Sequence, residues 1–392
     1  MELWRWVQAS PAVHLVSRRV PTALPGFPNG LVVHDVGLAR SRLRGRSEET
    51  LFVEDPVLAQ RLRRGLSFAE PVGGEGGPTL IRRGLPKFFD LDVEAFANSL
   101  QATGLGDPLS QLGCFQGGVG AQNSGAEQKL RQQVADSLVQ RVSDAWRAGR
   151  RILVSRLEKA NGENAQVSYM SATGQWVLCS KNVSLLASAP SEVSLPQWSD
   201  HRYRFARHVA ELWFDQLGRL EETGREALRE ALAARTLVGE LVGGSGAHLV
   251  DYGALRSLRW FAVVPHDSPE ACWAPSRSLA FLQGAGLPTV ASEQIGPATG
   301  CGSPSELLGT LRAASEAAEA APLAEAGEGF VLYFVSVPEG AVDLSAASTV
   351  WLGKLKTAEY RLLRRVREKA KHFARGAGCI LVEDVLTEFR RE

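Results

Sequence analysis

One lysine stands where the chain leaves an apolar strand and enters a polar turn. Lys159 follows the run RILVSRLE and precedes ANGEN, after which apolar alternation resumes in AQVSYM. The spacing of Val154 and Leu157 is typical of a half-buried strand, so we expect a tight turn over 160–163 at a sheet rim. Such a turn would present the lysine into a cleft.

A lysine in this position can act as a nucleophile once its amine is free. A free amine attacks phosphorus or carbonyl centres, but the ordinary lysine pKa of about 10.4 leaves almost no free amine at pH 7. Lowering that pKa by roughly three units means disfavouring the ammonium by about 4 kcal/mol, which nearby cations or a bound divalent metal would supply. The alternative is a surface lysine in a polar hairpin, which the turn sequence by itself favours.

Further charged residues lie inside or at the ends of apolar, strand-like runs. They are Lys181 after QWVLCS, Glu240 in TLVGELV, Glu328 before FVLYFV, and Lys354 with Lys356 in WLGKLK. Charges that face an interior are costly unless they are paired, bound to a metal or directed at a ligand. Each one alone could face outward from its strand. Together with the lysine turn, they indicate a pocket for a nucleoside triphosphate and its divalent cation.

The order of these segments resembles that of the covalent nucleotidyltransferases. EKANGEN resembles their lysine motif, TLVGELVG their third motif, EGFVLYF the fourth and KLKTAEY the fifth. LRRGLSF and RRGLPKFFDLD resemble segments ahead of the nucleophile in phage-type RNA ligases, and SKN resembles a segment that follows it. The resemblance runs from about residue 62 to 360. It is nearest to ATP-dependent RNA ligases of the phage RNA ligase 1 type.

The resemblance implies roles for the matching residues. Lys159 would carry AMP covalently as a lysyl-AMP intermediate, and Glu328 would hold the metal, Mg²⁺ or Mn²⁺. ATP would be bound by Glu158, Asn161, Gly162, Arg64, Lys87, Lys181, Glu240, Phe261, Glu328, Lys354 and Lys356, with Trp260 as the alternative to Phe261 for stacking on adenine. Asn161 departs from the family, which has Asp or His there.

The resemblance also implies an α+β fold in which antiparallel sheets flank a nucleotide cleft. We expect an N-terminal β-rich module over 1–97, built of short strands and loops rather than helices. A loop and helical insertion over 98–150, an adenylyltransferase core over 151–360 and a basic helical tail over 361–392 would follow. The residues after the fifth motif are too few for the OB domain of DNA ligases and capping enzymes, so we expect no OB domain.

Local signals add detail to this fold. Ser124, Thr223 and Ser303 each precede a glutamate by three residues, which predicts three helix starts, the last with a proline at its first position. AQVSYM and QWVLCSK read as strands paired through SATG, YRFARHVAELWFDQL as an amphipathic helix and TAEYRLLRRVREKAKHF as a basic one. A polar, glycine-rich stretch over 98–125 reads as a loop.

Composition limits the compartment and the partners. Forty-four basic against 43 acidic residues leave a net charge of +1, so any phosphate-binding surface must be a local patch. Five cysteines without a CxxC spacing argue against a disulfide framework or a structural zinc site. No run approaches the length of a membrane span, so we expect no membrane partner and an intracellular protein, cytoplasmic by default, with a nuclear or organellar location left open.

The resulting expectation is an ATP-dependent RNA ligase that joins RNA ends bearing a 5′-phosphate and a 3′-hydroxyl. RNA end-healing enzymes are further candidate partners. Rival interpretations are an RNA capping guanylyltransferase, a protein adenylyltransferase and a catalytically inactive RNA-binding relative. The retained charged residues count against the last of these.

Overall fold

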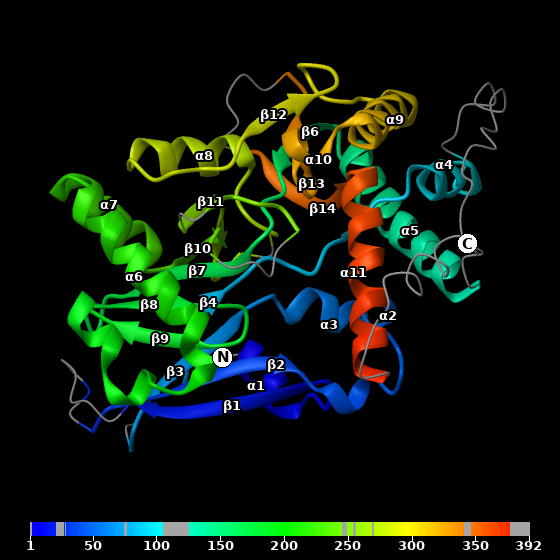
Figure 1. The fold of residues 1–392 in the computed structure, drawn as a ribbon. Helices are drawn as coiled ribbons and strands as arrows, with labels where there is room; N and C mark the ends of the chain where they lie inside the picture. Colours follow the sequence, from blue (N-terminus) through cyan, green and yellow to red (C-terminus); the bar gives the residue numbers. More distant parts are fainter. Residues whose placement is uncertain are drawn as a thin grey trace.

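The computed structural model describes residues 2–20, 27, 29–73, 77–104, 125–244, 249–253, 256–268, 270–340 and 346–376, with side chains up to residue 370 (Figure 1). The described residues form three sheets and the helices that cover them. Among them, no helix is long and apolar enough to cross a membrane.

The first sheet has the order β1-β2-β3-β4 and is antiparallel throughout. Its strands are β1 (Val13–Val20), β2 (Leu31–Leu38), β3 (Leu66–Pro71) and β4 (Thr79–Arg83). Three short helices pack with it around a core that includes Leu58 and Leu66: α1 (Glu2–Ala9), α2 (Glu48–Glu54) and α3 (Pro56–Arg61).

These helices correct the prediction of strands and loops alone over 1–97. Side chains cap two of them, since Ser47 accepts from Thr50 N and Asp55 from Leu58 N. Helices this short bury only one or two apolar residues each, so they leave no periodic pattern in the sequence. Tertiary packing stabilises them instead.

Two larger sheets form the centre of the molecule. One has the order β11-β10-β7-β8-β9, and the other has the order β12-β6-β13-β14-β5. Their strands are β5 (Phe89–Asp90), β6 (Arg150–Glu158), β7 (Glu163–Met170), β8 (Gln175–Cys179), β9 (Ser184–Ala187), β10 (Arg235–Val242), β11 (Ser257–Pro265), β12 (Ser292–Ile295), β13 (Gly329–Pro338) and β14 (Ser348–Lys356). All neighbouring strands are antiparallel except β5 and β14, which confirms an α+β fold with antiparallel sheets.

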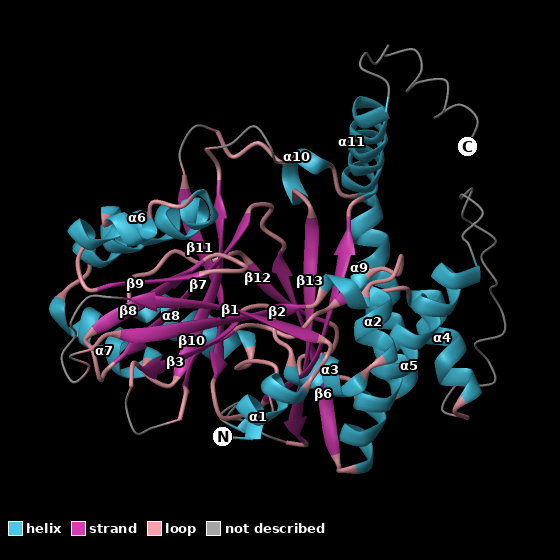
Figure 2. Cartoon of the chain, turned by 90° about the horizontal axis from the view of Figure 1, so that it is seen from below, coloured by secondary structure: helices cyan, strands magenta, loops and turns pink. Residues whose placement is uncertain are grey.

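The two central sheets enclose an apolar core and carry helices on their outer faces (Figure 2). Leu157 and Val331 of one sheet pack in this core with Val238 and Ala262 of the other. The helices on the two outer faces lie on opposite sides in Figure 2: α6 (Arg204–Arg219), α7 (Glu222–Leu232) and α8 (Pro275–Gly284) on one, and α4 (Val93–Ala102), α5 (Gly125–Arg147) and α9 (Pro304–Ala320) on the other. The short α10 (Leu323–Ala326) and the long α11 (Ala358–Gly376) flank β13 and β14 along the chain.

Most local predictions are confirmed. β7 and β8 form the predicted hairpin, α6 and α11 are the predicted amphipathic and basic helices, and Ser303 caps α9 by accepting from Glu306 N. The start predicted at Thr223 is wrong, because α7 already begins at Glu222, which places the threonine inside the first turn. Ser124 lies outside the described residues. The loop predicted over 98–125 begins later, since α4 continues to Ala102.

Candidate active site

Lys159 lies on a crossover between the two central sheets. β6, which ends at Glu158, belongs to one sheet, and β7, which begins at Glu163, belongs to the other. The backbone N–H of Lys159 donates to the Gly329 carbonyl at 2.8 Å, so the residue still follows the edge of β13. A surface lysine in a polar hairpin is therefore excluded, and 20% of its side chain is exposed.

The antiparallel order of the sheet brings distant motifs to one edge. β13 lies between β6 and β14, so the end of β6, the start of β13 and the end of β14 meet there. In register, Phe330 pairs with Glu158 and Gly329 pairs with Lys356. The lysine motif and the fourth and fifth motifs of the sequence thus converge through strand pairing.

The ammonium of Lys159 contacts a buried carboxylate. Its Nζ lies 2.7 Å from Glu328 Oε2, and Asn161 Nδ2 donates to the same oxygen at 2.8 Å. Asn161 Nδ2 also donates to the Tyr360 hydroxyl at 3.1 Å, and burial followed by the Glu328 charge raises the pKa of Tyr360 to about 12. An amide at 161 can donate to Glu328, whereas the Asp of the related motif would repel it unless protonated.

Glu240 approaches from the facing sheet. It pairs in register with Asn164 at the start of β7, and its Oε1 accepts from Gly162 N at 3.3 Å. Burial raises the pKa of Glu240 to about 7; the Lys159 charge acts against this and the Glu328 charge reinforces it. Gly162 is required sterically, since a Cβ there would lie 2.1 Å from the Leu241 carbonyl oxygen.

Two lysines at the end of β14 share one carboxylate. Asp90 Oδ1 lies 3.0 Å from Lys356 Nζ, and Asp90 Oδ2 lies 3.6 Å from Lys354 Nζ. Burial lowers the pKa of Lys354 to about 8; Asp90 opposes this shift, whereas Lys356, Lys87 and Lys159 add to it. The side chains of Lys354 and Lys356 are nearly buried, and the one carboxylate between them, Asp90, is largely exposed. The two lysines therefore keep a net positive charge that can bind an anion.

The N-terminal residues extend this positive charge. Lys87 Nζ lies 2.7 Å from Glu49 Oε1 and 3.7 Å from Glu48 Oε1, both on α2. The pKa of Lys181 lies below its ordinary value through partial burial and then through repulsion by Arg64 and Lys87, with the two glutamates opposing. We call Arg64, Lys87, Lys159, Lys181, Glu240, Glu328, Lys354 and Lys356 the charged cluster.

An open groove of about 820 Å³ lies beside the residue that precedes Lys159. Glu158, Arg259, residues of α8 and the segment 288–292 line it. Arg259 Nη1 and Glu158 Oε1 form an ion pair across 3.0 Å. The Arg259 guanidinium lies over the Tyr252 ring at 5.3 Å, and the Tyr252 hydroxyl accepts from Asn161 N at 2.9 Å. We call this the Glu158 groove, and its size is that of a small-molecule site.

The two aromatic candidates for stacking on adenine differ in their surroundings. Trp260 is fully buried on the outer face of its sheet, where its Nε1 donates to Gln216 at 2.9 Å and its ring meets Trp213 edge to face. This excludes Trp260 as a ligand contact. Phe261 is half-buried and packs against the core between the two sheets, so its role stays a prediction.

Among the described residues, no group of three His, Cys, Asp or Glu side chains is arranged to hold a metal ion. The protein alone therefore does not form a complete metal site in this part of the chain. Mg²⁺ commonly takes one or two carboxylates and completes its shell with substrate phosphates and water. Glu328 and Glu240, which interact electrostatically across the charged cluster, fit that mode.

Sequence reasoning did not single out several residues of this site. They are Asp90, Glu48, Glu49, Tyr252, Arg259 and Tyr360. Asp90 and Tyr360 lie within the segments PKFFDLD and KLKTAEY, so the motif matches already pointed at their neighbourhoods. The two glutamates begin a short helix that the sequence pattern did not reveal.

Comparisons with known proteins give a partial match. A family described as a domain of unknown function, DUF7920, matches residues 144–303, which include Lys159 and Glu240 and end before Glu328. A search of curated proteins finds no match.

Solved structures of RNA ligases show a distant likeness. An archaeal ATP-dependent RNA ligase in form 1 has 14% identity and a TM-score of 0.42, covering 92% of this chain and 64% of its own. Its form 2 has 15% identity, a TM-score of 0.36 and coverages of 79% and 55%. A Naegleria gruberi RNA ligase variant with ATP and Mn has 14% identity, a TM-score of 0.34 and coverages of 59% and 55%.

This chain thus spans about half to two thirds of the length of those ligases. At these identities and TM-scores the likeness carries no argument about activity, which depends on the geometry of the site.

Proposed function

We propose that this chain is an ATP-dependent RNA ligase that joins a 5′-phosphate to a 3′-hydroxyl through a lysyl-AMP intermediate. The observation that carries the proposal is the charged cluster, in which Lys159 lies against Glu328 and five further cations interact with this pair or with one another: Arg64, Lys87, Lys181, Lys354 and Lys356. A triphosphate has the charge to match these cations, and a lysine amine at this place has the chemistry to attack it.

In the first step, Lys159 Nζ attacks the α-phosphorus of ATP. An N–P bond forms, the bond to the β-phosphate oxygen breaks, and pyrophosphate leaves. The proton that the ammonium must lose first passes to solvent, and Glu328 Oε2, which lies 2.7 Å from Nζ, orients the amine. Charge grows on the phosphoryl oxygens during this step, so the ammonium groups of Lys354 and Lys356 stabilise its transition state.

In the second step an oxygen of the RNA 5′-phosphate displaces Lys159 from the AMP phosphorus and forms an RNA-adenylate. In the third, the 3′-hydroxyl attacks the RNA 5′-phosphorus, AMP leaves with its bonding electrons, and a phosphodiester forms. Bound Mg²⁺ or Mn²⁺ would supply Lewis-acid stabilisation to the phosphates, with Glu328 and Glu240 as its carboxylate ligands.

The Glu158 groove is the proposed place for the nucleoside. It adjoins Lys159 through the chain and provides hydrogen-bonding groups from Glu158 and Arg259 with apolar surface from Leu279 and Val290. Arg64 and Lys87, from the N-terminal part of the chain, would then face the β- and γ-phosphates that leave as pyrophosphate.

Incubation with ATP labelled at the α-phosphate, in the presence of Mg²⁺ or Mn²⁺, followed by a denaturing gel, tests the proposal. We expect an acid-labile, alkali-stable adduct that maps to Lys159 and is absent from Lys159→Ala protein, then transfer of AMP to 5′-phosphorylated RNA and sealing to a 3′-hydroxyl. Labelling by GTP instead of ATP would favour a capping guanylyltransferase. AMP transfer to protein alone would favour a protein adenylyltransferase, and RNA binding without any adduct an inactive relative.

A further inference from the structure

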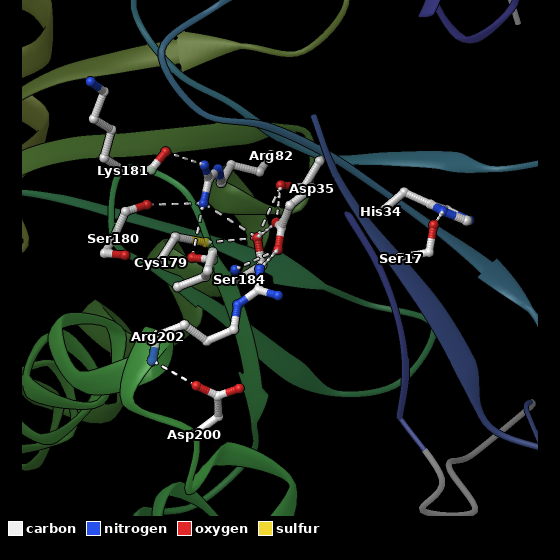
Figure 3. Close-up of polar contacts among 12 residues, drawn as sticks. Ser17, His34, Asp35, Arg82, Cys179, Ser180, Lys181, Ser184, Asp200 and Arg202 are labelled. Atoms are coloured by element: carbon white, nitrogen blue, oxygen red, sulfur yellow. Dashed lines mark hydrogen bonds and ion pairs between the residues drawn. The ribbon is translucent and has the colours of Figure 1, made fainter. Parts of the chain in front are cut away.

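The turn that carries Lys181 is held from another sheet. β8 and β9 belong to a central sheet, and the turn over 180–183 joins them. Arg82, on β4 of the N-terminal sheet, is 1% exposed and directs its guanidinium into this turn (Figure 3).

The contacts of Arg82 outline the inner side of the turn. Its Nη1 donates to the carbonyls of Ser180 and Val183, each at 3.1 Å, and to the Ser184 hydroxyl at 3.3 Å. Its Nη2 donates to the Lys181 carbonyl at 2.9 Å. A single planar guanidinium thus fixes three carbonyls of one tight turn, a geometry that a lysine ammonium cannot reproduce.

A second set of contacts fixes Arg82 and the turn together. Asp35 Oδ1 accepts from the hydroxyls of Ser67 and Ser184, each at 2.8 Å, and Asp35 Oδ2 accepts from Ser184 N at 3.3 Å. Asp35 and Ser67 belong to β2 and β3, so the N-terminal sheet contacts the start of β9 as well as the turn. Buried hydrogen-bond networks of this kind favour one geometry, although Arg82 Nε has no hydrogen-bond partner in this one.

The Lys181 side chain extends away from Arg82 while its carbonyl faces the guanidinium (Figure 3). On that outer side its ammonium interacts with Arg64 and Lys87 and with Glu48 and Glu49 of α2. The place of this ammonium in the charged cluster therefore depends on how the turn is held.

We propose that Arg82 is a positioning residue that holds the 180–183 turn so that Lys181 completes the phosphate-binding side of the charged cluster. The proposal rests on the proposed function for the role of Lys181, but not for the geometry of the turn. It makes the N-terminal sheet a structural part of the nucleotide site, in addition to Arg64 and Lys87, which lie just outside its strands β3 and β4.

Arg82→Lys tests this, and Arg83→Lys is its matched control. Arg83 is also nearly buried, at 8% exposed, and donates to the carbonyls of Pro265 and Ser268, away from the turn. Both changes remove buried guanidinium hydrogen bonds and should lower the melting temperature. Only Arg82→Lys should act on Lys181.

The first readout needs no activity. NMR titration of ¹³C-dimethylated lysines, with the Lys181 signal assigned by Lys181→Arg, reports the pKa of Lys181 directly. We expect that pKa to lie below the ordinary value in the wild type, to move toward it in Arg82→Lys and to stay in place in Arg83→Lys. Ser184→Ala removes one acceptor of Arg82 and keeps the guanidinium, so it should shift the pKa of Lys181 in the same direction by a smaller amount. If Arg82→Lys does not fold, the Ser184→Ala titration tests the proposal in its place.

The second readout is adenylylation. Arg82→Lys should raise KM for ATP about tenfold, the effect of weakening one charge-assisted contact, with little change in kcat. In a Lys181→Ala background Arg82→Lys should add no further loss, since both act through the same ammonium. An unmoved Lys181 titration, or additive losses in the double variant, would overturn the positioning role. A complete absence of adduct would refute the proposed function instead, while the titration would still decide the role of Arg82.

Discussion

At the scale of single residues, the ion pair between Lys159 and Glu328 joins two charges that lie largely out of solvent. The Glu328 side chain is 7% exposed and the Lys159 side chain 20%, so each depends on the other for solvation of its charge. Removing one member of such a pair leaves an uncompensated charge in a poorly solvated place.

We therefore expect Glu328→Ala to lower the free energy of unfolding by about 2 kcal/mol. The Lys159→Ala, Glu328→Ala double variant should lose less free energy of unfolding than the two single variants lose together. Urea unfolding of the wild type, the two single variants and the double variant gives the coupling free energy between Lys159 and Glu328. The exposed pair Arg147 and Asp144 is the control, where coupling should stay below about 0.5 kcal/mol. Equal coupling at the two sites would mean that Glu328 does not hold the lysine.

Glu240 makes stability depend on pH. Its pKa of about 7 lies above its ordinary value, so the folded state binds more protons than the unfolded state between pH 4.5 and 7. Stability should then fall as pH rises through this window, by up to about 3 kcal/mol from this group.

The measurement is urea unfolding at several pH values for the wild type and Glu240→Gln. The free energy of unfolding of the glutamine variant should change less with pH between 4.5 and 7 than that of the wild type. The two stabilities should be closest at acidic pH, where Glu240 is protonated. If both proteins show the same pH dependence, Glu240 titrates normally in the folded state.

At the scale of elements, α11 is docked at its start and exposes side chains in the turn that follows. Tyr360 is buried beside Asn161, and Arg361 forms an ion pair with Glu319 of α9. Arg364 and Arg365 are exposed, and the Arg364 charge acts on Asp90 and Tyr360. The helix thus carries positive charge from the charged cluster out to the surface.

We expect the Arg364→Ala, Arg365→Ala double variant to reduce the salt dependence of RNA binding, with the slope of log K against log salt falling by about 1.4 for two lost phosphate contacts on single-stranded RNA. Arg361→Ala is the control on the same helix, because Glu319 already neutralises that charge. Fluorescence anisotropy with 5′-phosphorylated RNA at several salt concentrations measures both. An unchanged slope in the double variant would remove α11 from the RNA surface.

At the scale of the whole molecule, the site exists only where the N-terminal sheet meets the central sheets. Arg64 N donates to the Leu85 carbonyl at 2.8 Å, and Gln166 Nε2 on β7 donates to the Arg64 carbonyl at 2.6 Å. Gly84 lies in this contact, and a Cβ there would approach the Arg64 carbonyl oxygen to 1.9 Å. No side chain can be accommodated without moving backbone.

Gly84→Ala should therefore cost about 3 kcal/mol of stability through overpacking and should raise KM for ATP, because it displaces Arg64. Gly309→Ala, in the middle of α9 with open space around the new Cβ, should instead stabilise by about 0.5–1 kcal/mol. Thermal melts together with adenylylation kinetics compare the two. A Gly84→Ala protein as stable and active as the wild type would mean that the two parts meet differently.

The sequence by itself pointed to a group of charged residues, because charges inside apolar strand patterns are recognisable wherever they occur along the chain. Strand runs, the amphipathic α6 and the capped α9 also followed from local periodicity and capping chemistry. Glu240, Glu328, Lys354 and Lys356 were singled out in this way, and Lys159 by the polar turn that follows its strand; their roles stay predictions.

Only the tertiary structure decided which partners those residues have. Strand order places Glu328 and Lys356 beside Lys159, and pairing between distant strands cannot be read from local pattern. The same holds for Trp260, whose burial on the outer face depends on alternation around a bulge in β11, and for the short α2, which is stabilised by packing. Arg82 is the clearest case: its sequence neighbours describe an ordinary strand, and its role depends on a turn about a hundred residues away that folding brings against it.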